Sequence, residues 1–340
     1  MTEVDLGTVF KGSESGEIVK AKGETIKLGP GQVVIDIAYS GLCGTDQHFR
    51  HNPNMVLGHE GVGIISQVDP LVKHYKVGDR VGWGYNHEAC GFCNHCWNGR
   101  DVICPDRKMY GVADLEWGSF GDRAVLNEFF IHRIPDNYPL RLAGPLQCGG
   151  ATVYSAILNA ESKPGQRVGV LGLGGLGHLA VQYLNKMGLH VTVISSSNSK
   201  REQALELGAS EFIATKENPD FKGVLPLDAL YVSTSFQPEW DQVVKVMAPG
   251  GALVPLTVSD EEFRFPYSSI LLKELRVIGS LVARRQVHRE MMEFSALNDV
   301  RPMVEELPMT EEGLNKAFAR LEKGDVRYRF VLKSQRTDAD

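Results

Sequence analysis

The sequence lacks the features that mark several large classes of proteins. None of its apolar runs approaches the ~18 residues that a membrane-spanning helix requires. Acidic residues (42) outnumber lysine and arginine (36), the net charge is -6 and no basic block occurs, which argues against nucleic acid or an anionic membrane as a partner. The first residues are polar and acidic, without the apolar or arginine-rich stretch of a targeting peptide, so we expect a cytoplasmic protein.

Two patterns of secondary structure follow one another along the 340 residues, which are enough for about two domains. Residues 1–147 hold short β-type runs separated by glycines, such as GQVVIDIAYSG. Residues 148–284 alternate buried strands with helices, beginning with RVGVLG and HLAVQYLNKMG, and residues 285–340 return to helix and a final strand, YRFVL. We predict an α/β protein: a β-rich domain from 1–147 and 285–340, and a doubly wound parallel-sheet domain of Rossmann type from 148–284.

A glycine-rich segment lies between the first strand and the first helix of the predicted parallel sheet. It reads Gly172-Leu173-Gly174-Gly175-Leu176-Gly177. Glycines in this strand–turn–helix context permit a tight turn and let the backbone approach a pyrophosphate at the N-terminus of the helix. The segment therefore predicts dinucleotide binding, and the alternative is a glycine-rich turn that binds nothing.

The end of the second strand indicates which dinucleotide binds. Enzymes that use NAD usually place an acidic residue there to accept from the ribose 2′-hydroxyl. This chain has Ile194-Ser195-Ser196-Ser197-Asn198-Ser199-Lys200-Arg201, with hydroxyl donors and two cations in place of a carboxylate. Such groups bind a 2′-phosphate, so we expect NADP(H). The alternative is that the segment only caps the next helix, with Ser199 as the N-cap.

The six cysteines form two groups and none is left over. One group, C-x₂-C-x₂-C-x₇-C, is typical of a closed structural zinc site and consists of Cys90, Cys93, Cys96 and Cys104. In the other group, Cys43 and Cys148 stand on either side of that cluster with His59 between them. Two thiolates and one imidazole predict a zinc site with an open position for chemistry. We interpret His95, within the four-cysteine segment, and His87, just before it, as surface residues.

These motifs resemble, in order and over nearly the whole chain, those of the zinc-dependent medium-chain alcohol dehydrogenases. Within that family the cinnamyl alcohol dehydrogenase-like branch, which binds NADP, is the most similar. The segments that carry the resemblance are GLCGTDQH, GHEGVG, GDRVGWG, the four-cysteine lobe, PLQCGGATVYSA, GLGGLG, ISSSNSKR and VRYRFVL. The resemblance implies a GroES-like fold for the β-rich catalytic domain, and a homodimer formed through the segment LRVIGSL.

The resemblance also implies roles for individual residues near the predicted catalytic zinc. Cys43, His59 and Cys148 would ligate the ion. Glu60 would lie beside it and enter the coordination shell when water or substrate exchanges. Asp46 resembles the carboxylate that orients a ligand. With the structural site, this implies two zinc ions per chain.

Further roles are implied for the substrate and the cofactor. Thr45 resembles the hydroxyl that bonds the substrate oxygen, His48 the outer end of a proton relay, and Thr152 a residue beside the nicotinamide. The positions that would hold the 2′-phosphate are Ser195, Ser196 and Lys200, with Arg201 as the second cation of that segment.

The expected function is hydride transfer between NADP(H) and primary alcohols or aldehydes with allylic, aryl or aliphatic groups. Two alternatives stay open. The same scaffold reduces iminium or conjugated C=C bonds in related enzymes, although an intact relay and both zinc sites favour carbonyl chemistry. The other alternative is a zinc-stapled binding protein without catalysis, against which the acidic net charge counts.

Arg284 and Arg285 stand where the family more often has small residues. Two interpretations stay open: the arginines contact the cofactor, or they lie at a subunit surface.

Overall fold

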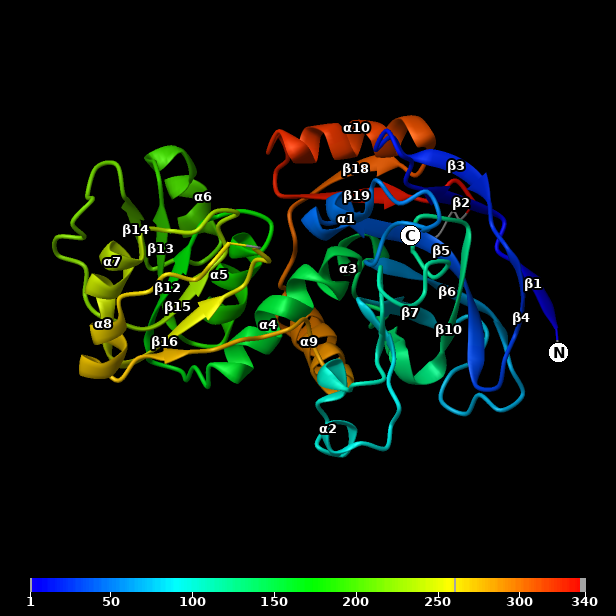
Figure 1. The fold of residues 1–340 in the computed structure, drawn as a ribbon, viewed down its shortest axis with the longest axis horizontal. Helices are drawn as coiled ribbons and strands as arrows, with labels where there is room; N and C mark the ends of the chain where they lie inside the picture. Colours follow the sequence, from blue (N-terminus) through cyan, green and yellow to red (C-terminus); the bar gives the residue numbers. More distant parts are fainter. Residues whose placement is uncertain (1, 260, 337–340) are drawn as a thin grey trace. The chain divides into compact units, whose positions relative to one another are not determined.

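The computed structural model describes residues 2–259 and 261–336. The chain forms two compact units (Figure 1): unit 1 contains Met1–Ala151 and Ala283–Asp340, and unit 2 contains Thr152–Val282. The domain boundaries predicted from the sequence, after residues 147 and 284, stay a prediction. Within the described residues, no helix combines the length and the apolar character needed to cross a membrane.

Unit 1 is built on a seven-stranded sheet whose central strand, β5 (Gln32–Leu42), is buried on both faces. Val33, Ile35 and Ile37 point into the main core, and Val34 points into a smaller cluster with Val4 and Leu28. Side chains of a strand alternate between its faces, so this pattern explains why the run GQVVIDIAYSG contains so few polar residues. The long central strand carries the residues around Cys43 to one edge of the core.

The neighbours of β5 follow the order β11-β7-β6-β5-β19-β18, and β10 also pairs with β5. All pairs are antiparallel except β18 with β19. Their bounds are β6 (Gly61–Val68), β7 (Arg80–Trp83), β10 (Arg123–Asn127), β11 (His132–Arg133), β18 (Val304–Pro308) and β19 (Arg329–Lys333). Short ladders outside this sheet are β1 (Glu3–Asp5) with β4 (Thr25–Lys27), β2 (Thr8–Lys11) with β3 (Val19–Lys22), and β8 (Asn86–Glu88) with β9 (Lys108–Met109).

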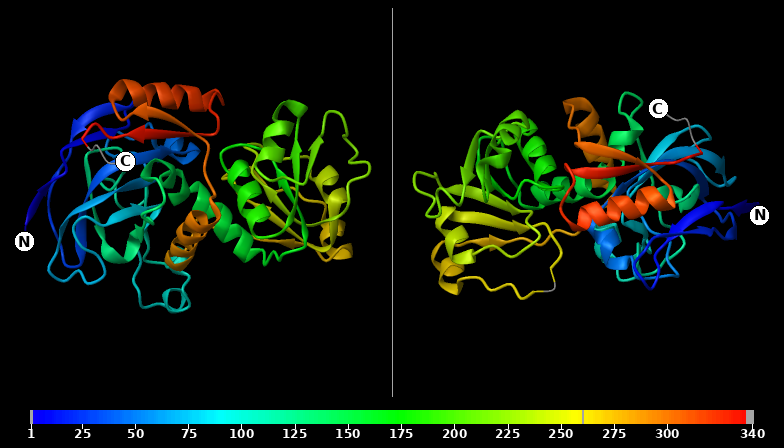
Figure 2. Two further views of the ribbon diagram at one scale, coloured as in Figure 1. Left: turned by 180° about the vertical axis from the view of Figure 1, so that it is seen from behind. Right: turned by 90° about the horizontal axis from the view of Figure 1, so that it is seen from above.

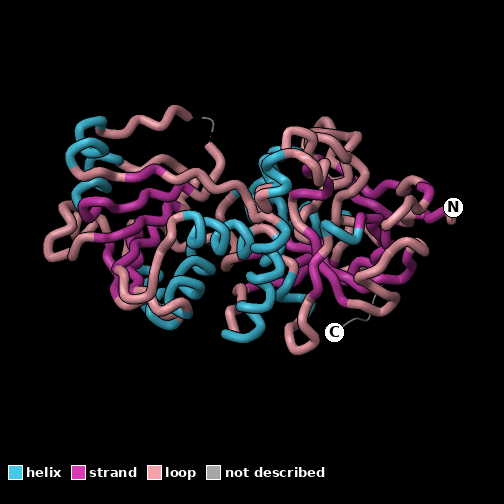
Figure 3. The backbone as a smooth tube through the Cα atoms, turned by 90° about the horizontal axis from the view of Figure 1, so that it is seen from below, coloured by secondary structure: helices cyan, strands magenta, loops and turns pink. Residues whose placement is uncertain are grey.

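The helices of unit 1 are few and mostly short, and loops occupy much of the unit (Figure 3). They are α1 (Gly44–Phe49), α2 (Asn94–Trp97), α3 (Leu140–Ala143), α9 (Arg285–Asn298) and α10 (Glu311–Glu322). Helix α10 lies over β18 and β19 (Figure 1) and buries Leu314, Ala317 and Phe318, which share one helical face. Its N-cap Thr310 accepts a hydrogen bond from the Gly313 amide at 3.1 Å.

Unit 2 contains a parallel six-stranded sheet in the order β14-β13-β12-β15-β16-β17, with helices on both faces (Figure 2). The strands are β12 (Arg167–Leu171), β13 (His190–Ser195), β14 (Glu211–Ala214), β15 (Leu227–Val232), β16 (Met247–Pro255) and β17 (Arg276–Val277). The helices are α4 (Gly149–Asn159), whose first three residues belong to unit 1, α5 (Gly177–Lys186), α6 (Arg201–Glu206), α7 (Trp240–Val243) and α8 (Tyr267–Leu272). This order is that of a doubly wound dinucleotide-binding sheet, which confirms the predicted fold class.

Candidate metal centre and cofactor loop

Three strand ends of unit 1 bring two of the predicted site residues together with an arginine that was not among the predictions. Cys43 follows β5, Glu60 precedes β6 and Arg329 is the first residue of β19. Because Phe330 is paired with Leu42 in the antiparallel ladder, the next pair along it places Arg329 beside Cys43. Cys148, 105 residues after Cys43, comes from the turn between the 3₁₀ helix Pro145–Gln147 and α4.

Four side chains of this region offer ligand atoms that all lie within 4.8 Å of one another: Cys43, His59, Glu60 and Cys148. We call this group the metal centre. The two sulfurs are 3.9 Å apart, and the Nδ1 of His59 lies 2.9 Å from the Asp46 carboxylate. Among the described residues, the buried Nε2 of His59 has no hydrogen-bond partner. Two sulfurs and a buried ring nitrogen without a partner are the donor set that zinc prefers, so the group fits that ion.

Glu60 is held beside this donor set by an ion pair with Arg329. Its Oε1 bonds the Nη2 of Arg329, and both side chains are buried. Its other oxygen, Oε2, has no hydrogen-bond partner among the described residues. A Cβ on Gly41 would lie 1.8 Å from that oxygen, so only glycine leaves room for the carboxylate. Glu60 therefore keeps one oxygen available while Arg329 balances its charge.

The charges around the metal centre shift the pKa values of its members in opposite directions. A hydrogen bond from Cys148 lowers the pKa of the Cys43 thiol well below its usual value, and the nearby Arg329 adds to this. The same hydrogen bond, together with burial, raises the pKa of Cys148. Burial raises the pKa of Glu60 to about 7 against the opposing charge of Arg329. A divalent cation would compete with the protons held here, so its binding should release them.

The carboxylate of Asp46 links the metal centre to the start of α1. Its Oδ2 accepts from the Cys43 amide at 2.9 Å, and its Oδ1 faces the His59 ring nitrogen. The hydroxyl of Tyr110 donates to the same Oδ1 at 2.7 Å and accepts from the Gly58 amide at 2.8 Å. Sequence reasoning found Asp46 but missed Tyr110 and Arg329. An arginine inside the apolar strand YRFVL was an available signal, whereas nothing in the sequence singled out Tyr110.

The two predicted relay residues lie three positions apart on α1. Residues at this spacing share a side of a helix. The Oγ1 of Thr45 lies 3.8 Å from the Cys43 sulfur, and His48, in the last turn, is exposed to solvent. One side of a single helical turn therefore runs from the metal centre to the surface of unit 1.

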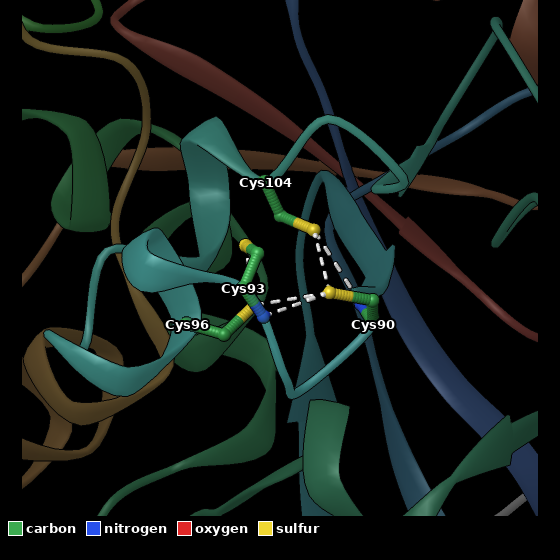
Figure 4. A group of neighbouring side chains, drawn as sticks. All are labelled: Cys90, Cys93, Cys96 and Cys104. Atoms are coloured by element: carbon green, nitrogen blue, oxygen red, sulfur yellow. Dashed lines mark hydrogen bonds between the residues drawn. The ribbon is translucent and has the colours of Figure 1, made fainter.

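The second cysteine group forms a separate lobe around α2 (Figure 4). Cys90 lies between Cys104 and Cys96, with sulfur–sulfur distances of 3.5 and 4.0 Å, and Cys93 is 3.7 Å from Cys96. The amides of Phe92 and Cys93 donate to the Cys90 sulfur, which lowers the pKa of that exposed thiol to about 7. Four converging thiols fit a closed tetrahedral zinc site.

Two histidines near this lobe differ in environment. His95 is exposed, as predicted, but the surface position predicted for His87 is wrong. His87 is fully buried, and its Nδ1 lies 2.5 Å from the Asp114 carboxylate. Spacing relative to the cysteines carried no information about Asp114, which approaches from the next loop. Arg285 lies over the Phe130 ring at 4.8 Å, and its Nε is 3.7 Å from Asp101 between the third and fourth lobe cysteines.

The glycine-rich segment of unit 2 has the geometry that dinucleotide binding requires. Gly172 has φ of +93°, a conformation that favours glycine. A Cβ on Gly177 would come 2.0 Å from the Gly172 carbonyl oxygen, so the helix can begin this close to the strand only with glycine. A Cβ on Gly174 would meet no atom within 4 Å, which leaves that stretch of backbone open. The ammonium of Lys200 donates to the Leu173 carbonyl at 2.8 Å.

The serine-rich segment after β13 differs from expectation in one detail. Ser199 lies inside the 3₁₀ turn Asn198–Lys200, and the N-cap of α6 is Lys200, so the predicted capping role of Ser199 is wrong. Ser195 ends β13 and Ser196 is exposed. Arg201 is exposed, bonds Asn198 and lies 5.0 Å from the Phe212 ring.

A carboxylate that the sequence did not reveal reaches this segment from the loop after β14. Glu217 accepts a hydrogen bond from the Asn198 amide group. The predicted nicotinamide contact, Thr152, is buried within α4.

A β-rich unit with a buried Cys/His metal centre, followed by a dinucleotide-type parallel sheet, defines a zinc-type dehydrogenase. Comparison with known proteins identifies the family. Residues 29–136 match the alcohol dehydrogenase GroES-like domain, and residues 175–296 match the zinc-binding dehydrogenase domain. The chain belongs to the zinc-binding alcohol dehydrogenase family, and the predicted GroES-like and Rossmann-type architecture is confirmed.

Individual relatives are similar over most of their length. An alcohol dehydrogenase of Geobacillus stearothermophilus is 34% identical, over 91% of this chain and 94% of its own. An NADP-dependent alcohol dehydrogenase C 1 of Mycolicibacterium smegmatis is 35% identical, over 90% of this chain and 91% of its own. The solved structure of a cinnamyl alcohol dehydrogenase from Sorghum bicolor superposes with a TM-score of 0.89 at 33% identity, covering 96% of both chains. The resemblance to the cinnamyl alcohol dehydrogenases is thus confirmed.

Proposed function

We propose that the protein transfers hydride between NADP(H) and primary alcohols or aldehydes at a zinc ion held by Cys43, His59 and Cys148. The observation that supports this most directly is the buried Nε2 of His59, which has no partner among the described residues and lies within 4.8 Å of the ligand atoms of Cys43, Glu60 and Cys148. A second zinc would occupy the four-cysteine lobe and hold its shape.

The residues in and around the metal centre would each have one task in the reaction. Bound zinc supplies Lewis acidity, which makes the hydroxyl proton of an alcohol easier to remove. Thr45 receives that proton and passes it toward His48, whose exposure lets it exchange with solvent. Asp46 fixes the His59 ring so that Nε2 stays available as a ligand. Glu60 is the reserve ligand, and the charge of Arg329 favours its ionised form against the effect of burial.

Two measurements test this proposal: the number of zinc ions bound per chain and the oxidation of NADPH in the presence of aldehydes. Native mass spectrometry should find two zinc ions per chain, whereas a zinc-stapled binding protein would carry only the lobe zinc. NADPH oxidation should depend on added aldehyde across a panel of allylic, aryl and aliphatic aldehydes. No turnover with any aldehyde, combined with turnover of iminium or enoyl compounds, would move the assignment to the alternative reductase chemistry.

We infer NADP(H) as the cofactor from the residues after β13. Ser195, Ser196 and Lys200 offer two hydroxyls and a cation, and one relative is named as NADP-dependent. The negative charge of Glu217 lies beside this segment and would repel a phosphate. Its carboxylate accepts a hydrogen bond from Asn198, and a phosphate bound by the two serines and Lys200 would not need to break that bond. We expect kcat/KM to favour NADPH over NADH by ~10-fold or more, the order of one or two charge-assisted bonds.

The variant Lys200→Ala tests the cofactor inference. It should lower kcat/KM for NADPH about tenfold, because one charge-assisted bond to the 2′-phosphate is lost, and leave kcat/KM for NADH within about twofold. Glu217→Gln serves as the matched control in the same surface region, since removing a negative charge should raise NADPH affinity slightly or not at all. Equal losses with both cofactors in Lys200→Ala would show that Lys200 only supports the glycine loop.

We also propose that the protein is a homodimer that works in the cytoplasm. Strand β17 is the edge of its sheet, and the exposed apolar residues in or near it in the sequence include Tyr267, Leu271, Leu272 and Val277. An apolar sheet edge of this kind is a ready pairing surface. Light scattering should give twice the mass of one chain, and Leu272→Asp should reduce it to the mass of one. Six free cysteines used as ligands require a reducing compartment, which favours the cytoplasm.

A further inference from the structure

A buried chain of hydrogen bonds extends the metal centre beyond Asp46. The Gly58 amide donates to the Tyr110 hydroxyl at 2.8 Å, and that hydroxyl donates to Asp46 Oδ1 at 2.7 Å. The same oxygen faces the Nδ1 of His59 at 2.9 Å. Asp46, His59 and Tyr110 are all completely buried. The hydroxyl therefore touches the one carboxylate oxygen that controls the His59 ring.

We propose that Tyr110 is a positioning residue for zinc: its hydroxyl holds the Asp46 carboxylate in the orientation that keeps the Nε2 of His59 aimed at the ion. The proposal rests on the proposed zinc site at Cys43, His59 and Cys148. A carboxylate with a single partner can rotate, whereas Asp46 is fixed at both oxygens, by the Cys43 amide at Oδ2 and by Tyr110 and His59 at Oδ1. Partners that orient ligands in this way affect metal affinity measurably.

The ring of Tyr110 is held independently of its hydroxyl. It stands edge-on to Phe49 at 5.5 Å and to Tyr85 at 5.9 Å, and its centroid lies 4.8 Å from that of His59. The backbone amide of Tyr110 donates to the Tyr85 carbonyl at 2.9 Å. Removing only the oxygen should therefore leave the ring in place. The Gly58 amide would lose its partner, and Oδ1 of Asp46 would keep only the His59 ring as a contact.

Tyr110 also connects the cysteine lobe with the metal centre. The chain leaves the cysteine lobe after Cys104 and forms strand β9, which ends at Met109. The next residue is Tyr110, whose hydroxyl donates to Asp46. The lobe is thereby connected to the metal centre through one covalent segment and one hydroxyl. A folded lobe would help to hold Tyr110 beneath Asp46.

The test compares Tyr110→Phe with a matched control, Tyr138→Phe. Tyr138 is also buried in unit 1, and its hydroxyl donates to the Val300 carbonyl at 2.6 Å. Each variant loses one buried hydroxyl, so both should show a lowered Tm. Zinc release from the holoprotein is followed with a chelator in excess, and native mass spectrometry counts the ions that remain. We expect Tyr110→Phe to lose one zinc roughly ten times faster than the wild type and the other at the wild-type rate. Tyr138→Phe should release both ions at wild-type rates.

A double substitution establishes whether Tyr110 acts through Asp46. In the Asp46→Asn background, Tyr110→Phe should accelerate zinc release by less than about twofold, because the carboxylate it positions is already gone. A full tenfold acceleration in that background would overturn the proposal, and so would wild-type release rates in Tyr110→Phe alone. A wild-type protein that carries only one zinc would instead refute the proposed function. A structural role alone would lower Tm in both tyrosine variants without separating the two zinc ions.

Discussion

The metal centre and the cysteine lobe of unit 1 both contain cysteine thiols, but they differ in how far apart in the sequence their cysteines lie. The lobe takes all four sulfurs from the short segment between Cys90 and Cys104, where backbone amides of the segment already support Cys90. The metal centre takes its sulfurs from positions 105 residues apart and adds a buried ring nitrogen and a buried ion pair. One group depends on local geometry, and the other depends on the whole fold of the unit.

The difference explains which group suits catalysis. Four thiols close a tetrahedron and leave no position for a substrate, whereas three donors with a carboxylate in reserve leave one. The metal centre is sensitive to substitution because it is buried, and water cannot solvate its unpaired polar atoms and charges. We therefore expect substitutions at the metal centre to act on function and on buried charge, and substitutions at the lobe to act on local stability.

The largest contrast should come from removing one thiol at each group. Cys43→Ala should lower kcat at least ~1000-fold, since loss of a ligand removes the Lewis acid, while the fold and the lobe zinc persist. Cys93→Ala should release the lobe zinc and lower Tm, with kcat per folded molecule changed far less. Activity assays, circular dichroism and zinc counts on both variants measure the contrast. Equal losses of activity per folded molecule would show that the lobe takes part in catalysis.

The two regions should also differ in how much an ion pair matters. Arg329→Met leaves the buried Glu60 carboxylate without its counter-charge, which should lower the free energy of unfolding by about 3–5 kcal/mol. Lys108→Met breaks the Lys108–Glu88 pair beside the lobe, whose side chains are 46% and 44% exposed, and should cost at most about 1 kcal/mol. Denaturant titrations of both variants give the values.

A double variant controls for packing at Arg329. Glu60→Gln combined with Arg329→Met should be more stable than Arg329→Met alone, because no uncompensated charge remains. Were the double variant the less stable protein, the loss would come from packing around the arginine rather than from the charge of Glu60.

Much of this architecture could be predicted from the sequence, because the motifs that carry it are local. Glycines 172, 174 and 177 sit between a strand and a helix, and their pattern is sufficient to predict the turn. The lobe cysteines are close in sequence and therefore close in space. Cys43, His59 and Cys148 are distant from each other in the sequence, so donor type and the resemblance to a family grouped them, whereas their spacing could not.

The errors concern partners supplied by distant segments. His87 lies next to the cysteine lobe in sequence, yet Asp114 pairs with it in the interior. Glu217 reaches Asn198 across two parallel strands, which no reading of the serine segment alone could show. Tyr110 and Arg329 likewise meet Asp46 and Glu60 only through tertiary packing. Buried polar contacts between remote segments have no local period, so the sequence holds no simple signal for them.

A smaller effect is the pH dependence that Glu60 of the metal centre should give to the free energy of unfolding. With zinc removed, burial raises the pKa of Glu60 from 4.5 to about 7, so the folded protein keeps a proton that the unfolded chain loses. The stability contributed by this proton is complete below pH ~4.5 and is lost as the pH rises through ~7, an amount of roughly 3 kcal/mol. The difference in unfolding free energy between wild type and Glu60→Gln should fall accordingly. A difference that stays constant from pH 4.5 to 8 would show that Glu60 is ionised throughout.

The smallest effect should come from the contact that fastens the lobe to α9. Arg285 stacks on Phe130 at 4.8 Å and approaches Asp101 at 3.7 Å, but its side chain is 34% exposed, so solvent weakens both interactions. Arg285→Gln should therefore lower the free energy of unfolding by only about 1 kcal/mol. The lobe zinc should be retained and kcat should change less than twofold, because the four sulfurs need no support from outside the segment 90–104. Faster loss of the lobe zinc in this variant would contradict the view that the lobe is locally determined, since it would make α9 part of what holds the cysteines together.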